Sequence, residues 1–247
     1  MKTKKKKNAK EKSAKKSAKN KLEKTEREQK KRRERGRLIV FEGLDASGKH
    51  TQCVLLLAKL KSLGLRTAFY AFPAYDTRYG KLIARYLAGE FGPKDALSPK
   101  AVAALYALDR AQFRDAISRD LKSGKTVVCD RYVQSNLYQA AKLPREQRPK
   151  FEAWAQRLEA SAPAADAVVF LDVPVARGRE MLRKRGRKID VHEADAAYQK
   201  EVQQEYLLAA KREKNWVVVE CAARGRMLSR EEIAERVWAA LKKRGIL

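Results

Sequence analysis

The chain has 247 residues, 44% of them hydrophobic, which is enough to bury a core in one or two domains. Its 57 Lys and Arg against 30 Asp and Glu give a formal net charge of +27, and the charge density is highest at the N-terminus. No stretch approaches the ~18 consecutive apolar residues of a membrane-spanning helix, so we expect no interaction with a membrane.

Residues 1–36 form a highly basic segment that we interpret as a disordered or transiently helical tail. Residues 1–37 hold 19 Lys and Arg and five Glu, while residues 1–36 contain one leucine and no aromatic residue. Without an apolar face the tail cannot contribute to a core, so residues 37–247 are predicted to form the folded domain. Because a Lys-rich tail binds phosphates without sequence preference, a nucleic-acid-binding protein is one alternative for the function.

The twelve-residue segment FEGLDASGKHTQ, which begins at Phe41, follows an apolar run and precedes a helical pattern. This order predicts a strand, a tight turn and a helix. Gly43 and Gly48 permit close approach of the backbone, and Lys49 places a cation beside the free N–H groups of a helix N-terminus. The spacing GxxxxGK is that of a P-loop, although His50 stands where a Ser or Thr normally holds magnesium. The segment therefore predicts a polyphosphate site.

The rest of the chain alternates short apolar runs with helical patterns. Strands are predicted at residues 38–41, 66–72, 126–129, 167–173 and 216–220. A helix is predicted directly after the P-loop. Further helices are predicted from the turn 74–77 to about 89, at 98–121, 133–142, 146–160 and 176–185, from the end of the basic stretch 183–188 to about 211, and from 229 onward. Apolar strands without alternation, separated by helices, are typical of a parallel sheet covered on both faces. We predict one α/β domain with ligands at the carboxyl ends of its five strands.

Three of these strand ends carry residues that suit a nucleotide: the P-loop, Phe72-Pro73 and Asp130-Arg131. The Asp130 carboxylate could hold the hydration shell of a magnesium ion, and the Arg131 guanidinium could bind a phosphate through two hydrogen bonds. A surface ion pair is the alternative for these two residues. Arg110 lies in a predicted helix, where a solvated charge is the simplest interpretation.

Together these motifs resemble the thymidylate kinase (dTMP kinase) family, from about residue 38 to the end of the chain. They follow the family's order: FEGLDASGKHTQ, Phe72-Pro73 with Gly80, the helix 105–110, CDRY, FLDV, and Asp190 and Glu193 beyond an Arg-rich lid. The resemblance implies a P-loop kinase fold, with a five-stranded parallel sheet, helices on both faces and a lid at about 183–194. It also implies transfer of the ATP γ-phosphoryl group to dTMP with Mg²⁺, giving dTDP and ADP for dTTP synthesis.

The same resemblance implies roles for individual residues. Phe72 would stack on thymine, Arg131 would bind the dTMP phosphate, and Tyr138 or Gln139 would exclude a 2′-hydroxyl. The implied dTMP contacts are Asp45, Phe72, Arg110, Arg131, Asn136, Tyr138 and Gln139. The implied ATP contacts are Gly43, Leu44, Asp45, Ala46, Ser47, Gly48, Lys49, His50 and Thr51, and the metal contacts are Asp130 and Thr51. The implied catalytic residues are Lys49, Asp130, Arg131, Arg183, Arg185 and Arg187.

The chain departs from the family pattern at several positions. Tyr75 replaces a phosphate-binding Arg that many members have, and the segment 135–139 is one residue shorter. Ala46 follows Asp45 where some members have a basic residue, so the catalytic arginine is expected in the lid. A kinase of another nucleoside monophosphate therefore stays an alternative. The family commonly forms homodimers, and three widely spaced cysteines predict reduced thiols and a cytoplasmic location.

Overall fold

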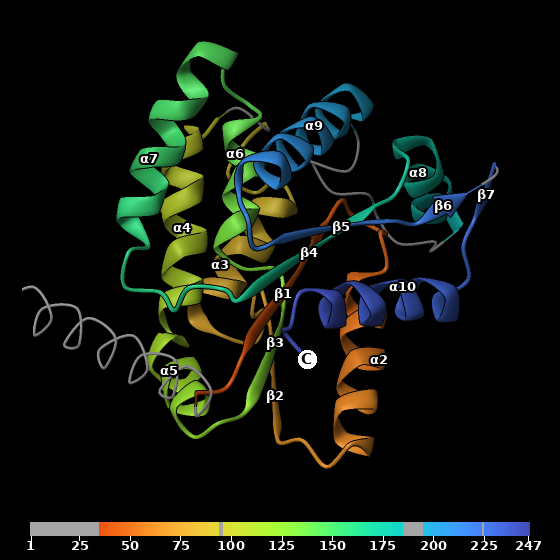
Figure 1. Cartoon of the computed structure of the whole chain (residues 1–247). Helices are drawn as coiled ribbons and strands as arrows, with labels where there is room; N and C mark the ends of the chain where they lie inside the picture. The colour runs from red at the N-terminus through yellow and green to blue at the C-terminus, as the bar shows by residue number, and fades with distance from the viewer. Residues whose placement is uncertain (1–34, 94–95, 185–194, 224) are drawn as a thin grey trace, which may run out of the picture.

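The five predicted strands pair in parallel in one sheet, as seen in the computed structural model, which describes residues 35–93, 96–184, 195–223 and 225–247 (Figure 1). Their order in the sheet is β2-β3-β1-β4-β5. The bounds are β1 Leu38–Gly43, β2 Thr67–Ala71, β3 Thr126–Asp130, β4 Ala167–Asp172 and β5 Trp216–Glu220. The predicted tail up to residue 34 and the lid residues 185–194 lie outside the described part of the chain.

The central position of β1 explains its apolar sequence. All six of its residues are buried, because β3 and β4 pair with its two edges and helices cover its two faces. Successive side chains of a strand point to opposite faces, so Leu38 and Val40 lie in one core and Ile39 and Phe41 in the other. The carboxyl end of β1 therefore emerges between the ends of its neighbours, where Phe41 lies opposite Asp130.

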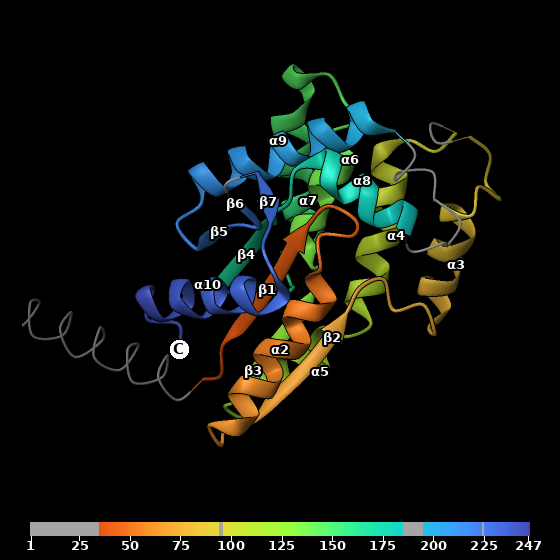
Figure 2. The ribbon, with the colours of Figure 1, turned by 90° about the vertical axis from the view of Figure 1, so that its right-hand side faces the viewer.

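Helices cover both faces of the sheet, as predicted. The α-helices are α2 Lys49–Ser62, α3 Arg78–Leu87, α4 Pro99–Ala111, α5 Arg114–Lys122, α6 Leu137–Ala140, α7 Arg148–Leu158, α8 Val175–Lys184, α9 Ala196–Arg212 and α10 Arg230–Lys243. Short 3₁₀ helices occupy Val133–Asn136 (η1) and Arg145–Gln147 (η2). Helices α2 and α10 bury one face, and α5, α6 and α9 bury the other, with α4 and α7 further out (Figures 1 and 2).

The long helix predicted at 98–121 is wrong, because two helices occupy this segment. The chain leaves the helix after Ala111 and resumes it at Arg114. A turn intervenes, in which the Phe113 amide donates to the Arg110 carbonyl at 3.0 Å. The Phe113 ring then packs edge-on against Phe72, with 5.6 Å between centroids. The residue in the turn between the two helices thus packs against the core next to Phe72.

Two segments of the structure differ from the sequence-based prediction. Arg35, assigned to the tail, forms an ion pair with Asp166 at 3.1 Å, and Gly36 donates its amide to the Leu121 carbonyl. A small antiparallel pair, β6 Ala222–Ala223 and β7 Arg226–Met227, was not predicted. Two residues per strand are too few for a sequence pattern. None of the described helices is long and apolar enough to cross a membrane.

Candidate active site

The P-loop has the backbone conformation that its glycines predict. Gly48 has a φ of 85°, a left-handed value that glycine adopts without strain, and Ala46 has a φ of 60°. A side chain at Gly43 would lie 2.7 Å from the Ser47 hydroxyl, so this position has no room for one. Helix α2 begins at Lys49, and its free N–H groups therefore face the loop. These free N–H groups give the loop the chemistry that an anion would require.

Lys49 holds its ammonium group inside this loop. Its Nζ donates to the carbonyl oxygens of Gly43 at 3.1 Å and Leu44 at 2.8 Å, and the residue is 8% exposed. Burial, followed by the charge of the nearby Arg131, lowers the pKa of Lys49 to about 8, while surrounding carboxylates oppose the shift. A polyphosphate in the loop would add anionic charge and so favour the ammonium form of Lys49.

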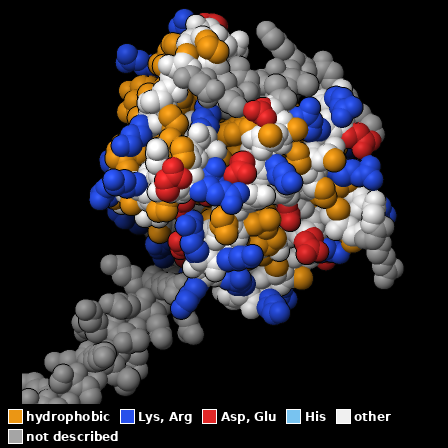
Figure 3. Space-filling view, turned by 90° about the horizontal axis from the view of Figure 1, so that it is seen from above, with side chains coloured by type: hydrophobic (Ala, Val, Ile, Leu, Met, Phe, Trp, Pro, Cys, Tyr) orange, Lys and Arg blue, Asp and Glu red, His pale blue; other side chains and the backbone are white. Residues whose placement is uncertain are grey.

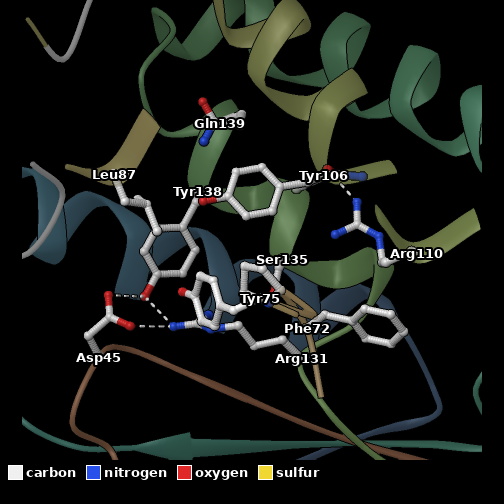
Figure 4. Close-up of a pocket in the computed structure, with 12 residues that line it drawn as sticks. Asp45, Phe72, Tyr75, Leu87, Tyr106, Arg110, Arg131, Ser135, Tyr138 and Gln139 are labelled. Carbon is white, nitrogen blue, oxygen red and sulfur yellow. Dashed lines mark hydrogen bonds and ion pairs between the residues drawn. The ribbon is translucent and has the colours of Figure 1, made fainter. Parts of the chain in front are cut away.

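One pocket is lined by all seven residues for which the resemblance implied a contact with dTMP (Figure 4). They converge from the P-loop, the end of β2, helix α4, the end of β3, and the η1–α6 segment. Residues far apart in the chain meet here because parallel strands end at the same edge of the sheet. Pro73, Tyr75, Leu87, Tyr106 and Ser135 complete the lining.

Arg131 lies beside the P-loop in this pocket. Its Nη2 donates to Asp45 Oδ1 at 2.6 Å and to the Tyr138 hydroxyl at 3.3 Å (Figure 4). The guanidinium also lies over the Tyr138 ring, 4.9 Å from its centroid. The surface ion pair considered for Asp130 and Arg131 is wrong, because Arg131 pairs with Asp45 and its side chain is 16% exposed.

Arg110 is buried, so the interpretation of this residue as a solvated helix charge is wrong. Its Nε and Nη2 donate to the two carboxylate oxygens of Glu159 at 2.7 and 2.5 Å. Asn136 accepts a third hydrogen bond from Arg110 and donates to the same carboxylate. The side chains of Arg110 and Glu159 are 3% and 6% exposed. Glu159 lies 49 positions further along the chain, and no local pattern in the sequence marked it as a partner.

Asp109, the neighbour of Arg110 on α4, holds the loop that follows β2. Its carboxylate accepts hydrogen bonds from the Ala74 amide at 3.0 Å and from the Thr77 hydroxyl at 3.2 Å. Burial raises the pKa of Asp109, while these hydrogen bonds lower it. Phe72, at the start of the loop, is 5% exposed and precedes Pro73 through a cis peptide bond. Helix α4 thus supplies Arg110 to the pocket and, through Asp109, holds the loop that follows Phe72.

Asp130 faces His50 across the mouth of the P-loop. The distance from His50 Nδ1 to Asp130 Oδ2 is 3.5 Å, and the histidine side chain is 68% exposed. The structure, over the ranges that it describes, contains no cluster of three or more His, Cys, Asp or Glu that could hold a metal. Magnesium usually binds through one or two carboxylates and the substrate's phosphates, so a single carboxylate at this place fits such an ion. Thr51 lies half-buried in the first turn of α2.

The predicted lid arginines are described in part. Arg183 lies exposed near the end of α8, whereas Arg185 and Arg187 lie outside the described residues. Helix α8 passes over the P-loop, since a side chain at Gly178 would lie 3.6 Å from the Asp45 carbonyl. The lid at 183–194 and its catalytic role stay predictions.

Comparison with known proteins identifies the family. The thymidylate kinase family model matches residues 41–233. This chain belongs to the thymidylate kinase family. It is 36% identical over 150 residues to a thymidylate kinase of Arabidopsis thaliana, covering 60% of this chain and 53% of that protein. It is 33% identical over 213 residues to a probable thymidylate kinase of Pyrococcus abyssi, covering 84% of this chain and 97% of that protein.

The fold agrees with this family. The solved structure of thymidylate kinase from Candida albicans superimposes with a TM-score of 0.71 and 25% sequence identity. The superposition covers 86% of this chain and 93% of the Candida chain. The predicted P-loop kinase fold and enzyme class, a nucleoside monophosphate kinase, are therefore confirmed.

Proposed function

We propose that this site transfers the γ-phosphoryl group of ATP to dTMP, giving dTDP and ADP. The observation that carries the proposal is the position of the pocket, which opens beside the P-loop and shares Asp45 with it. A phosphate donor in the loop and an acceptor in the pocket would thus approach each other near Arg131. Phosphoryl transfer needs such positioning together with charge stabilisation, and little covalent chemistry from the protein.

The inner part of the pocket suits a flat pyrimidine. Phe72 offers an aromatic face for stacking, and Arg110 and Asn136 offer donors and acceptors for the edge of the base. Glu159 anchors both polar groups, so their orientation is set before a base enters. Arg131 would bind the dTMP phosphate, because its guanidinium is charged and lies at the P-loop end of the pocket.

The sugar would lie near Tyr138. Its hydroxyl is 3.4 Å from Asp45 Oδ2 and 3.3 Å from Arg131 Nη2, at the end of the pocket nearest the P-loop (Figure 4). Gln139 lies farther from Asp45 and Arg131 than Tyr138 does in the same view. Of the two candidates, Tyr138 and Gln139, we therefore propose that Tyr138 excludes a 2′-hydroxyl.

Asp130, with Thr51, would hold a hydrated Mg²⁺ beside the ATP phosphates. The ion would neutralise charge on the phosphates, as in other phosphoryl transferases. His50 offers an imidazole where a hydroxyl oxygen is usual, and magnesium prefers oxygen ligands. Asp130 therefore carries the metal contact in this proposal, with water and the phosphates completing it.

The catalytic cations would be Lys49 from the loop and the lid arginines 183, 185 and 187. Ala46 leaves the P-loop without a basic side chain after Asp45, which is why the lid is expected to supply one. Replacing the three arginines with Ala should lower kcat far more than it raises the KM for dTMP. Turnover within about threefold of wild type would instead give the role to Arg131.

Three further features belong to the proposal: a homodimer, a cytoplasmic location, and non-specific polyanion binding by residues 1–36. On the face seen from above, Lys and Arg are scattered among acidic and apolar side chains rather than gathered in one patch (Figure 3). Nucleic-acid binding is proposed for the tail, as an accessory to the kinase, because the tail has the highest density of Lys and Arg in the chain.

A coupled ADP-release assay tests the proposed function. The wild-type protein is offered ATP with dTMP, dUMP, dCMP, UMP, CMP or AMP, and Lys49→Ala is the negative control. We expect the highest kcat/KM with dTMP, and a loss of about 10²- to 10³-fold in rate for the variant. A preference for another monophosphate would favour the alternative kinase. Turnover of dTMP by Lys49→Ala at close to the wild-type rate would exclude the P-loop as the phosphate site.

A further inference from the structure

Glu42, the residue before Gly43 on β1, is a carboxylate with no exposed surface. Its Oε1 accepts a hydrogen bond from the Tyr132 amide at 3.0 Å, and its Oε2 accepts one from the Tyr206 hydroxyl at 2.7 Å. The Ser135 hydroxyl lies 2.9 to 3.0 Å from both oxygens, and Arg131 Nη1 lies 3.9 Å from Oε2. Four groups from two distant segments thus converge on one acid.

A buried carboxylate is unfavourable unless hydrogen bonds and a positive charge compensate for lost hydration. Burial raises the pKa of Glu42, while Arg131 and the three hydrogen-bond donors lower it. An apolar residue at this position would carry no desolvation penalty, and most other residues of β1 are apolar. The compensating partners are also unevenly distributed, since three of the four belong to the segment 131–135 that follows β3. The Glu42 carboxylate therefore binds mainly one segment, residues 131–135.

That segment has an unusual backbone at Arg131, with a φ of 64°. Left-handed values are uncommon for residues other than glycine and persist where surrounding contacts enforce them. Two successive amides supply those contacts: Arg131 donates to the Phe41 carbonyl at 2.9 Å, and Tyr132 donates to Glu42. The turn directs the Arg131 guanidinium back toward the P-loop, where it meets Asp45 at 2.6 Å.

We propose that Glu42 is a positioning residue for Arg131, holding the segment 131–135 on β1 so that the guanidinium is oriented before substrate enters. The inference rests on the proposed function, in which Arg131 binds the acceptor phosphate. Charge fixed in advance stabilises a transferring phosphoryl group without reorganisation during the reaction. A displacement of about 1 Å at such a group can cost on the order of 10²-fold in rate.

The alternative is that Glu42 only stabilises the fold, and Asp166 provides a matched control. Asp166 is also a carboxylate that anchors β1, but at the opposite end of the strand. It accepts a hydrogen bond from the Leu38 amide at 2.9 Å and pairs with Arg35. A purely structural carboxylate should affect unfolding and leave the chemistry unchanged.

The experiment is a double-mutant cycle in the full-length protein. Glu42→Gln and Asp166→Asn are each made in wild type and in Arg131→Ala, and thermal unfolding, kcat and KM for dTMP are measured for all six proteins. We expect Glu42→Gln to lower kcat about 10- to 100-fold in wild type. In Arg131→Ala the same change should cost less than about threefold, because the positioned group is gone. Asp166→Asn should lower the Tm and leave kcat within about twofold in both backgrounds.

Equal kcat losses from Glu42→Gln in the two backgrounds would overturn the inference while leaving the proposed function intact. Near wild-type activity in Arg131→Ala would contradict the proposed role of Arg131, and the positioning role of Glu42 with it. If Glu42→Gln does not fold, Tyr206→Phe replaces it in the cycle, since it removes one hydrogen bond from the same carboxylate. A kcat loss of about threefold from Tyr206→Phe in wild type, with no loss in Arg131→Ala, supports the inference. Equal losses in these two backgrounds refute it.

Discussion

ATP binding should weaken as the pH rises above about 8. An ordinary lysine at position 49 would keep its charge, and so the affinity for ATP, to a higher pH. Burial, followed by the charge of Arg131, lowers the pKa of Lys49 to about 8 from the usual 10.5, although Asp45 and Asp130 oppose the shift. A polyphosphate in the loop favours the ammonium form. Above about pH 8 the free protein has lost the proton that nucleotide binding must restore, so the affinity falls as pH rises.

The size of the effect follows from the pKa. At about pH 9 roughly one molecule in ten keeps the Lys49 proton, so the affinity should fall about tenfold from its value near pH 7. A lysine with the usual pKa would lose almost nothing over the same range. Isothermal titration calorimetry with ATP measures the affinity, and two buffers of different ionisation enthalpy count the proton taken up. Lys49→Arg is the control, because a guanidinium stays charged throughout.

Two results would refute this reasoning. The first is a wild-type affinity that stays constant to about pH 9.5, and the second is an equal decrease in Lys49→Arg, which would assign the titration to another group. Stability should change in the opposite sense. The unfolded chain keeps the Lys49 proton up to about pH 10.5, whereas the native protein releases it near 8. This residue's contribution to the free energy of unfolding therefore increases with pH between these values.

Three further predictions concern other parts of the molecule. Glu159→Gln leaves the buried Arg110 charge without its anion and should destabilise the protein by about 3–5 kcal/mol; urea unfolding measures this, and an unchanged midpoint would contradict the buried pair. His50→Thr restores a hydroxyl beside the P-loop and should lower the Mg²⁺ concentration needed for half-maximal nucleotide binding, whereas no change would separate this position from the metal. Deleting residues 1–34 should reduce heparin binding and leave kcat and Tm nearly unchanged; an inactive truncated protein would make this segment part of the domain.

Local patterns in the sequence were sufficient to predict the sheet and the P-loop. A buried parallel strand needs a continuous apolar run, and five such runs were present. The P-loop needs glycine at two defined positions and a lysine at the start of a helix, which Gly43, Gly48 and Lys49 satisfy. Since the carboxyl ends of parallel strands share one edge, the sequence also predicted that Phe72 and Asp130 would lie near the loop.

Only the tertiary structure decided which charges are buried and what compensates for them. In the sequence Arg110 resembles an ordinary solvated helix charge. In the fold it is buried and pairs with Glu159, which lies 49 residues away. An acidic residue in an apolar strand, Glu42, marks an unusual position in the sequence. Its partners Tyr132 and Tyr206 lie 90 and 164 residues further on, where no sequence pattern connects them to it. Short-range patterns report on neighbours along the chain. Desolvation and pairing depend on neighbours in space, and these set the protonation and orientation of the side chains in the site.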